Sequence, residues 1–288
     1  INIVTRDPVD TLGLRANAAV GENGIRDVQA SVGWSLENAS FRLGADQRAD
    51  EGLEGANGRN RVNRVNFRAD LRPTLKDEIQ LRLGGLGVDS GAGYTFDPGR
   101  AQRPRQISNS YLQLDWRRNL GPDSDLALSY SHSDESYKDN FSYPLPAPLN
   151  EVTIDFGGRA SSDTLSVQHS YRSNADLRLV WGGEFRQEQV VSRPLYDTLA
   201  PQETRFTRVF GNAEWRAGRD VVVNAGGLLE TNSRSADLFS PRLMVNWHFA
   251  PGQTLYAYAM FAAPPQNVTT LDVQLLDGAT TATSVPFT

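Results

Sequence analysis

The chain has 288 residues, of which 39% are hydrophobic and 22% are charged, and its formal net charge is −5. No apolar run reaches the roughly 18 residues that a membrane-spanning helix needs, so the sequence excludes a helical transporter or channel. It does not exclude a transmembrane β-barrel, because barrel strands turn an apolar side chain to lipid only at every second position. The acidic balance is a poor match for a protein that wraps nucleic acid, and a chain with 0 cysteines has no disulfide framework and no cysteine nucleophile.

Apolar and polar residues alternate along almost the whole chain, which is the pattern of β-strands with one apolar and one polar face. The clearest runs are residues 28–36, 64–71, 177–186 and 242–249. Weaker runs are residues 41–45, 79–83, 112–116, 126–130, 165–171, 209–215 and 221–229. We count about thirteen strands of roughly 10 residues each, the length that crosses a bilayer when the strand is tilted.

The connections between these strands are sorted by length. One set is short and rich in turn residues: residues 37–40, 73–77, 121–124, 173–176, 217–220 and 250–253. The other set is mostly longer: residues 50–60, 88–104, 134–158, 191–203, 231–240 and the stretch from 262 onward, with only 21–27 brief. Short periplasmic turns at one end and long extracellular loops at the other predict an all-β fold, a transmembrane antiparallel up-and-down β-barrel.

Aromatic and charged residues refine this prediction. Four of the 5 tryptophans lie on the apolar side of their strands close to a short turn, and we expect Trp34, Trp116, Trp215 and Trp247 to form a girdle at the membrane interface. Many charged residues share the opposite side, which indicates a wide, wet lumen or a lumen filled by a separate polar plug. A single-layer sheet with a solvated polar face stays open as an alternative.

Two segments resemble the TonB-dependent outer-membrane receptors. The run Ile1-Asn2-Ile3-Val4-Thr5-Arg6 is similar to the last strand of the plug domain in that family. Residues 240–247, which read SPRLMVNW, and residues 251–257, which read PGQTLYA, resemble a hairpin in the middle of the receptor barrel. The sequence also starts inside a strand-like run, and we expect it to be cut out of a longer chain.

The resemblance implies a barrel of 22 strands preceded by a plug, of which this chain would carry about 13 strands. Residues 1–10 would be the last plug strand and the linker, and residues 11–288 a partial barrel that ends in an extracellular loop. It also implies the bacterial outer membrane as location, outer-membrane lipid and lipopolysaccharide as surroundings, and contact with TonB only through a missing N-terminal region.

The resemblance further implies an active-transport receptor, not an enzyme, for a ferric siderophore, a corrinoid or a similarly scarce nutrient. Haem receptors of the family carry an Arg where this chain has Ala262, and no His follows His248. Siderophore or vitamin transport is therefore favoured over haem uptake, and no cofactor is expected.

Ligand contacts are expected in the long loops, where aromatic rings and guanidinium groups suit a flat, anionic catecholate–iron complex. The candidates are Tyr94, Phe96, Arg100, Arg103, Arg105, Tyr137, Phe141, Tyr143, Arg193 and Tyr196. The alternative for each is an upper aromatic girdle, with arginines that face lipopolysaccharide phosphates. The 3 histidines have no metal-ligand spacing, so neither a metal site nor a catalytic residue is predicted.

Two other functions stay open from the sequence. A passive porin-like channel would need no plug, and a soluble β-sheet module for carbohydrate binding or adhesion would pack its apolar side chains into a closed core. We also expect an open or poorly closed sheet with unpaired edge strands near residues 12–20 and 255–261.

Overall fold

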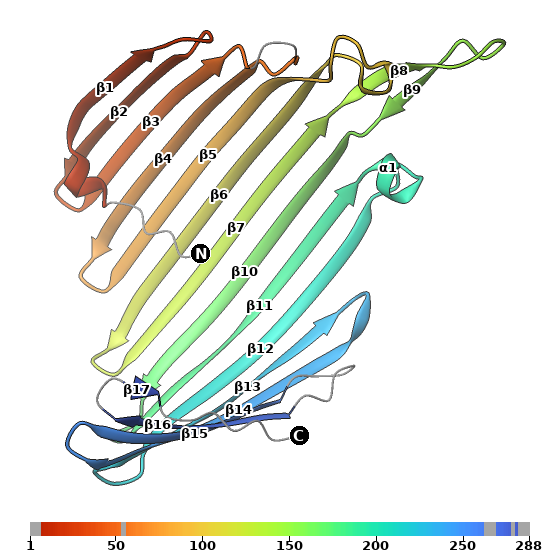
Figure 1. Cartoon of the computed structure of the whole chain (residues 1–288). Helices are drawn as coiled ribbons and strands as arrows, with labels where there is room; N and C mark the ends of the chain where they lie inside the picture. Colours follow the sequence, from red (N-terminus) through yellow and green to blue (C-terminus); the bar gives the residue numbers. More distant parts are fainter. Residues whose placement is uncertain (1–6, 53–55, 262–268, 278–279, 282–288) are drawn as a thin grey trace. The chain divides into compact units, whose positions relative to one another are not determined.

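A computed structural model describes residues 7–52, 56–261, 269–277 and 280–281, and the chain in it is almost entirely β-structure (Figure 1). The first elements are η1 (Pro8–Thr11), β1 (Gly13–Val20), β2 (Arg26–Leu36), β3 (Ala39–Asp50), β4 (Asn60–Thr74), β5 (Asp77–Ala92), η2 (Pro98–Arg100), β6 (Arg103–Gly121) and β7 (Ser124–Lys138). They are followed by β8 (Asn140–Pro144), β9 (Glu151–Asp155), β10 (Gly158–Arg172), β11 (Leu177–Val191), α1 (Arg193–Tyr196), β12 (Gln202–Arg216), β13 (Val221–Asn232), β14 (Ser235–Ala250), β15 (Gln253–Phe261), β16 (Thr269–Asp277) and β17 (Thr280–Thr281).

The strands pair in sequence order, as expected for an up-and-down sheet. One sheet of 15 strands runs from β1 to β17, with thirteen of them up to β15, and a separate hairpin of β8 and β9 is inserted between β7 and β10. The predicted all-β, up-and-down fold and the strand count up to β15 are confirmed. Within the described residues no helix is long and apolar enough to cross a membrane.

By its internal contacts the chain divides into two compact units. The first comprises Ile1–Trp116, Ser129–Asp163 and Gln187–Glu203, and the second comprises Arg117–Leu128, Thr164–Arg186 and Thr204–Thr288. In the first unit, the register of β2 to β5 separates two faces rung by rung. Trp34, Phe41, Ala69 and Leu81 share one rung of the apolar face, and Gly33, Arg42, Arg68 and Arg82 share a rung of the polar face.

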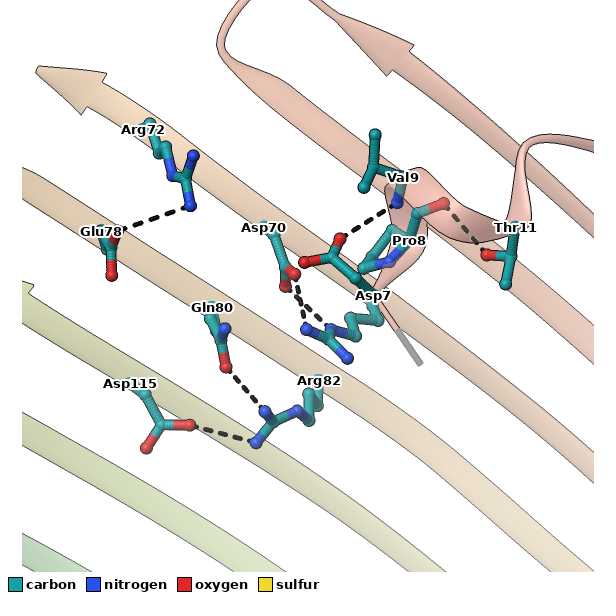
Figure 2. A network of polar contacts seen from close by, with 11 residues as sticks. Asp7, Pro8, Val9, Thr11, Asp70, Arg72, Glu78, Gln80, Arg82 and Asp115 are labelled. Atoms are coloured by element: carbon teal, nitrogen blue, oxygen red, sulfur yellow. Dashed lines mark hydrogen bonds and ion pairs between the residues drawn. The ribbon is translucent and has the colours of Figure 1, made fainter. Parts of the chain in front are cut away.

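The alternation of side chains explains this separation, because successive residues of a strand point to opposite faces. On the apolar face Trp34 stacks on Phe41 with ring centroids 5.2 Å apart. On the polar face Arg68 is bonded to Asp70 at 2.6 Å, and Arg82 reaches Asp115 at 3.3 Å (Figure 2). Arg68 and Arg82 of this face are thus each paired with an aspartate of the sheet.

The η1 turn lies against the polar face near the β2–β3 and β4–β5 turns (Figure 2). Asp7 begins it, with its carboxylate accepting a hydrogen bond of 3.0 Å from the Val9 backbone N–H. Gly33 permits the close approach, since a Cβ there would lie 2.3 Å from the carbonyl oxygen of Thr11. The turn and strand β2 can therefore pack together only because this position has no side chain.

Three expectations need correction. The long loop predicted over 231–240 is wrong, because β13 and β14 continue to a tight turn with Asn232 paired to Ser235. Strands β2 to β7 and β10 to β14 are also longer than 10 residues, with 11 in β2 and 19 in β6, because backbone pairing continues past the apolar part of each strand.

The third correction concerns the edges of the sheet. β15 is not an edge strand, since all of Gln253–Phe261 pairs with β16. The edge predicted at residues 12–20 is confirmed, because β1 stands at one end of the strand order. The plug-like run Ile1–Arg6 and the segment from Ala262 to Pro264 lie outside the described residues.

Candidate functional site at the long-loop end

The connection between β5 and β6 is held in place by backbone geometry and by one asparagine. Gly93 has a φ of +87°, and a Cβ there would come within 2.2 Å of the Ala101 carbonyl oxygen, so only glycine fits. The side-chain amide of Asn57, from the β3–β4 connection, donates to the carbonyl groups of Ala92 and Arg103, each at 3.2 Å. Asn57 thereby ties together both ends of the loop that carries Tyr94 and Arg100.

Asp139, directly after β7, is the polar centre of this end of the sheet. Its side chain is only 5% exposed, and both of its oxygens accept hydrogen bonds from the Arg103 guanidinium, one of them from Nη2 at 3.2 Å. The Tyr137 hydroxyl donates to the same carboxylate at 3.0 Å. Burial alone would favour the neutral acid, but the bonds from Arg103 and Tyr137 outweigh it and lower the pKa of Asp139.

The β8–β9 hairpin begins at this anchor, and in Figure 1 it extends past the end of β7. The Arg103 guanidinium stands over the Phe141 ring, 4.3 Å from its centroid, and Phe141 in turn contacts Phe156 at 6.1 Å. The paired charges and the rings thus hold the base of the hairpin against β6.

A cavity of about 390 Å³ lies between this hairpin and the β5–β6 loop. Its walls combine aromatic and aliphatic groups with two guanidinium groups: Tyr94, Arg100, Arg103, Phe141, Tyr143, Ile154 and Phe156, with small residues of the loop between them. Arg103 is committed to Asp139, whereas the exposed side chain of Arg100 makes no hydrogen bond or ion pair with the described residues. Arg100 is therefore the cation that remains available to a ligand.

Of the ten residues predicted to contact ligand, five line this cavity: Tyr94, Arg100, Arg103, Phe141 and Tyr143. Tyr137 lies behind them on Asp139. The other four stand elsewhere: Phe96 is 94% exposed on the loop, Arg105 lines a separate groove, and Arg193 and Tyr196 belong to α1.

Sequence reasoning missed Asn57, Asp139, Ile154 and Phe156. Asp139 and Arg103 are 36 positions apart, so no local pattern links them. The alternation of β9, in which Ile154 pairs with Phe141, is a signal that could have revealed the hairpin.

The four tryptophans predicted for the girdle lie near the short-turn ends of their strands. Trp34 stacks on Phe41, and Trp247 contacts Phe249 with centroids 5.5 Å apart. Trp215 stands beside Val223 of β13 and is half exposed. Trp116 differs from them, because its Nε1–H donates to the Asp77 carboxylate at 3.0 Å.

The described residues contain no group of three or more histidine or acidic side chains arranged to hold a metal ion. The cavity between the hairpin and the β5–β6 loop is instead suited to stacking and to one charge-assisted hydrogen bond.

Comparison with known proteins identifies the type of fold. Residues 22–285 match the family model described as TonB dependent receptor-like, beta-barrel. No curated protein matches the sequence.

Solved structures of siderophore receptors are similar in fold. The ferric-catecholate import receptor Fiu of E. coli K12 shares 8% identity at a TM-score of 0.65, over 92% of this chain and 55% of that one. The siderophore receptor PirA of Acinetobacter baumannii shares 13% identity at a TM-score of 0.61, over 87% and 43%. The ferripyoverdine receptor of Pseudomonas aeruginosa shares 12% identity at a TM-score of 0.63, over 92% and 46%. The chain thus spans about half the length of these proteins.

Proposed function

This chain belongs to the TonB-dependent receptor β-barrel family, and from that premise we propose that it is part of an outer-membrane receptor that imports a ferric siderophore or a similar scarce nutrient. The family consists of transport receptors rather than enzymes, and its members lie in the outer membrane of Gram-negative bacteria. The same proposal includes energy from TonB, which would act through a part of the receptor outside this chain. It also includes lipid and lipopolysaccharide as the surroundings of the barrel.

The observation that carries the proposal is the cavity between the β8–β9 hairpin and the β5–β6 loop. Its tyrosine and phenylalanine rings offer faces on which a flat aromatic chelate stacks, and Arg100 offers an uncompensated positive charge. Catecholate oxygens around ferric iron carry negative charge and accept hydrogen bonds from such a guanidinium. A ferric catecholate is therefore the ligand class that this set of side chains fits best.

The two arginines of the cavity have different roles in this proposal. Arg100 binds the anionic ligand directly. Arg103 is a positioning residue, because its guanidinium fixes Phe141 through the ring face and fixes the hairpin base through Asp139. Loss of Arg103 would displace the aromatic side chains of the cavity but would leave Arg100, the cation that binds the ligand, in place.

The test is equilibrium binding of a ferric tris-catecholate complex to the purified full-length receptor, followed by quenching of tryptophan fluorescence. Replacing Arg100 by Gln removes one charge-assisted hydrogen bond, and we expect the Kd to rise about tenfold. Tyr94→Ala removes a stacking face and should raise the Kd about three- to tenfold.

Matched controls exist on the long connections between strands. Phe96 lies on the loop of Tyr94, and Arg193 is a cation on α1, and neither of them lines the cavity. Phe96→Ala and Arg193→Gln should leave the Kd within about twofold of the wild type. The proposed site is wrong if these controls weaken binding as much as the cavity variants, or if neither cavity variant changes it.

A further inference from the structure

The apolar face of β2 to β5 ends in a rung that is charged instead of apolar. Arg26, Ala49, Arg61 and Asp89 are successive partners across the four strands. They have the same parity as Trp34, Phe41 and Leu81, so they point to the apolar face and not to the face that carries Arg68. Two arginines thus stand at the end of the face that carries Val, Leu, Phe and Trp, next to a rung in which Gln47 donates to Asn63 at 2.7 Å.

Neither of these arginines is neutralised by a neighbour. Arg26 and Arg61 are both exposed, and neither side chain makes a hydrogen bond or an ion pair with the described residues. Asp89 is opposite Arg61, but its carboxylate accepts a hydrogen bond of 3.1 Å from Gln106. The arginines of the polar face differ, because Arg64 and Arg68 each form an ion pair with an aspartate at 2.6 Å.

The small residue between the two arginines leaves room for a ligand. Ala49 separates them by two strand spacings, about 10 Å between backbones. A groove of about 460 Å³ follows this rung and is also lined by Arg59 and Arg105. Asp50, Glu51 and Asp89 lie in the same groove, and of these Asp50 already accepts a hydrogen bond from the Gly52 N–H.

The level of this rung on the sheet identifies the kind of partner. β2 runs over 11 residues from Arg26 to Leu36 at its short-turn end, which is about 33 Å along the strand. A strand tilt of about 40° reduces this to about 25 Å of height, which equals the height of the apolar band on an outer-membrane barrel. Arg26 and Arg61 would therefore lie where the hydrocarbon ends and the lipid headgroups of the outer surface begin.

We propose that Arg26 and Arg61 form a binding site for a phosphorylated lipid headgroup at the outer surface of the membrane. The inference rests on the proposed function, since it needs the apolar face of β2 to β5 to be in contact with lipid. Guanidinium groups bind phosphate oxygens in a bidentate manner, and an exposed, unpaired arginine beside hydrocarbon is otherwise unfavourable. The lipid would fix the β2–β4 region at a defined depth.

The experiment measures lipid binding to the purified full-length receptor in neutral detergent by native mass spectrometry. The probes are lipid A with two phosphates and the same lipid after removal of both phosphates. The double variant R26Q/R61Q should weaken binding of the phosphorylated probe at least about tenfold, because two charge-assisted contacts are lost. Its affinity for the dephosphorylated probe should not change.

Two arginines of β3 and β4 provide a control for loss of charge. Arg48 and Arg64 lie on β3 and β4 on the opposite, polar face, next to Asp46. R48Q/R64Q removes the same charge at nearly the same height, and we expect it to bind both probes like the wild type. R26K/R61K keeps the charge but loses the bidentate geometry, so its affinity for the phosphorylated probe should lie between those of the wild type and R26Q/R61Q.

Two results would overturn the proposal: equal losses in R26Q/R61Q and R48Q/R64Q, or equal losses for the two probes. Binding of the ferric tris-catecholate is measured on the same samples and should be unaffected by R26Q/R61Q. A receptor that binds lipid as expected but no ferric tris-catecholate would refute the proposed ferric-catecholate site and leave the lipid site intact.

Discussion

At the scale of single residues, Asp139 connects the hairpin to the sheet, and its effect should depend on pH. Because the folded-state pKa of this carboxyl is lowered, its contribution to stability is complete at pH values above the ordinary carboxyl pKa of about 4 and disappears as the pH falls through the lower, folded value. We expect amide hydrogen exchange in the β8–β9 hairpin to accelerate in that acidic range.

The substitution Asp139→Asn should mimic the acid state at neutral pH. It removes the charge that Arg103 and Tyr137 stabilise, which costs about 2 kcal/mol of local stability and speeds exchange in the hairpin about thirtyfold. Glu151→Gln is the control, because Glu151 is exposed on β9 and its side chain makes no hydrogen bond with the described residues. Unchanged exchange in the Asp139 variant would show that the ion pair does not hold the hairpin.

Residue types in the loops revealed part of the site but not its arrangement. Tyr94 and Arg100 could be predicted because aromatic and cationic residues in a long loop are exposed and have few structural uses. Phe96, four positions before Arg100, fits the same criterion, yet it points away from the cavity. The difference is set by the backbone at Gly93 and by Asn57, which are tertiary features that no local pattern encodes.

At the scale of elements, Trp116 joins two strands through a polar contact on the apolar face. Its indole N–H donates to Asp77, whose side chain is 7% exposed and also accepts a hydrogen bond of 2.6 Å from Thr74. The contact fixes the β4–β5 turn against β6. Trp116→Phe keeps an aromatic ring but leaves a carboxylate with one donor fewer, so we expect a loss of about 1 to 2 kcal/mol, seen as a lower midpoint of thermal unfolding in detergent.

Trp215→Phe is the matched comparison for this prediction. Trp215 is half exposed near a short turn, as is expected for an interface residue, but its indole makes no hydrogen bond with the described residues. Its replacement should change the unfolding midpoint less than that of Trp116. If the two variants are equally destabilised, the loss comes from ring size and not from the bond to Asp77.

Strand positions followed from the alternation of apolar residues, whereas strand ends did not. The apolar pattern of β13 fades after Leu229, so the sequence pattern predicts a loop over 231–240. The ladder nevertheless continues to Asn232 and Ser235, because main-chain hydrogen bonds form between polar residues as readily as between apolar ones. The apolar pattern in the sequence thus ends before the strand does.

At the scale of the whole molecule, β1 is an edge with one neighbour in the strand order. Along an edge strand, the backbone N–H and C=O groups of one residue point to the paired strand and those of the next residue point to the free side. The free groups form a template for another strand, so we expect the 288-residue chain, refolded by itself in detergent, to associate as its concentration rises. Analytical ultracentrifugation measures this association.

Proline substitutions can separate edge pairing from loss of the fold. Ala16 and Ala18 have one parity in β1, and Asn17 and Ala19 have the other. Proline at the pair whose N–H groups point to the free side removes those donors, and it should abolish association without loss of strand content in circular dichroism. Proline at the other pair breaks the ladder to β2 and should reduce strand content. A chain that stays monomeric without any substitution, or associates equally with proline at either pair, would show that β1 does not act as an open edge.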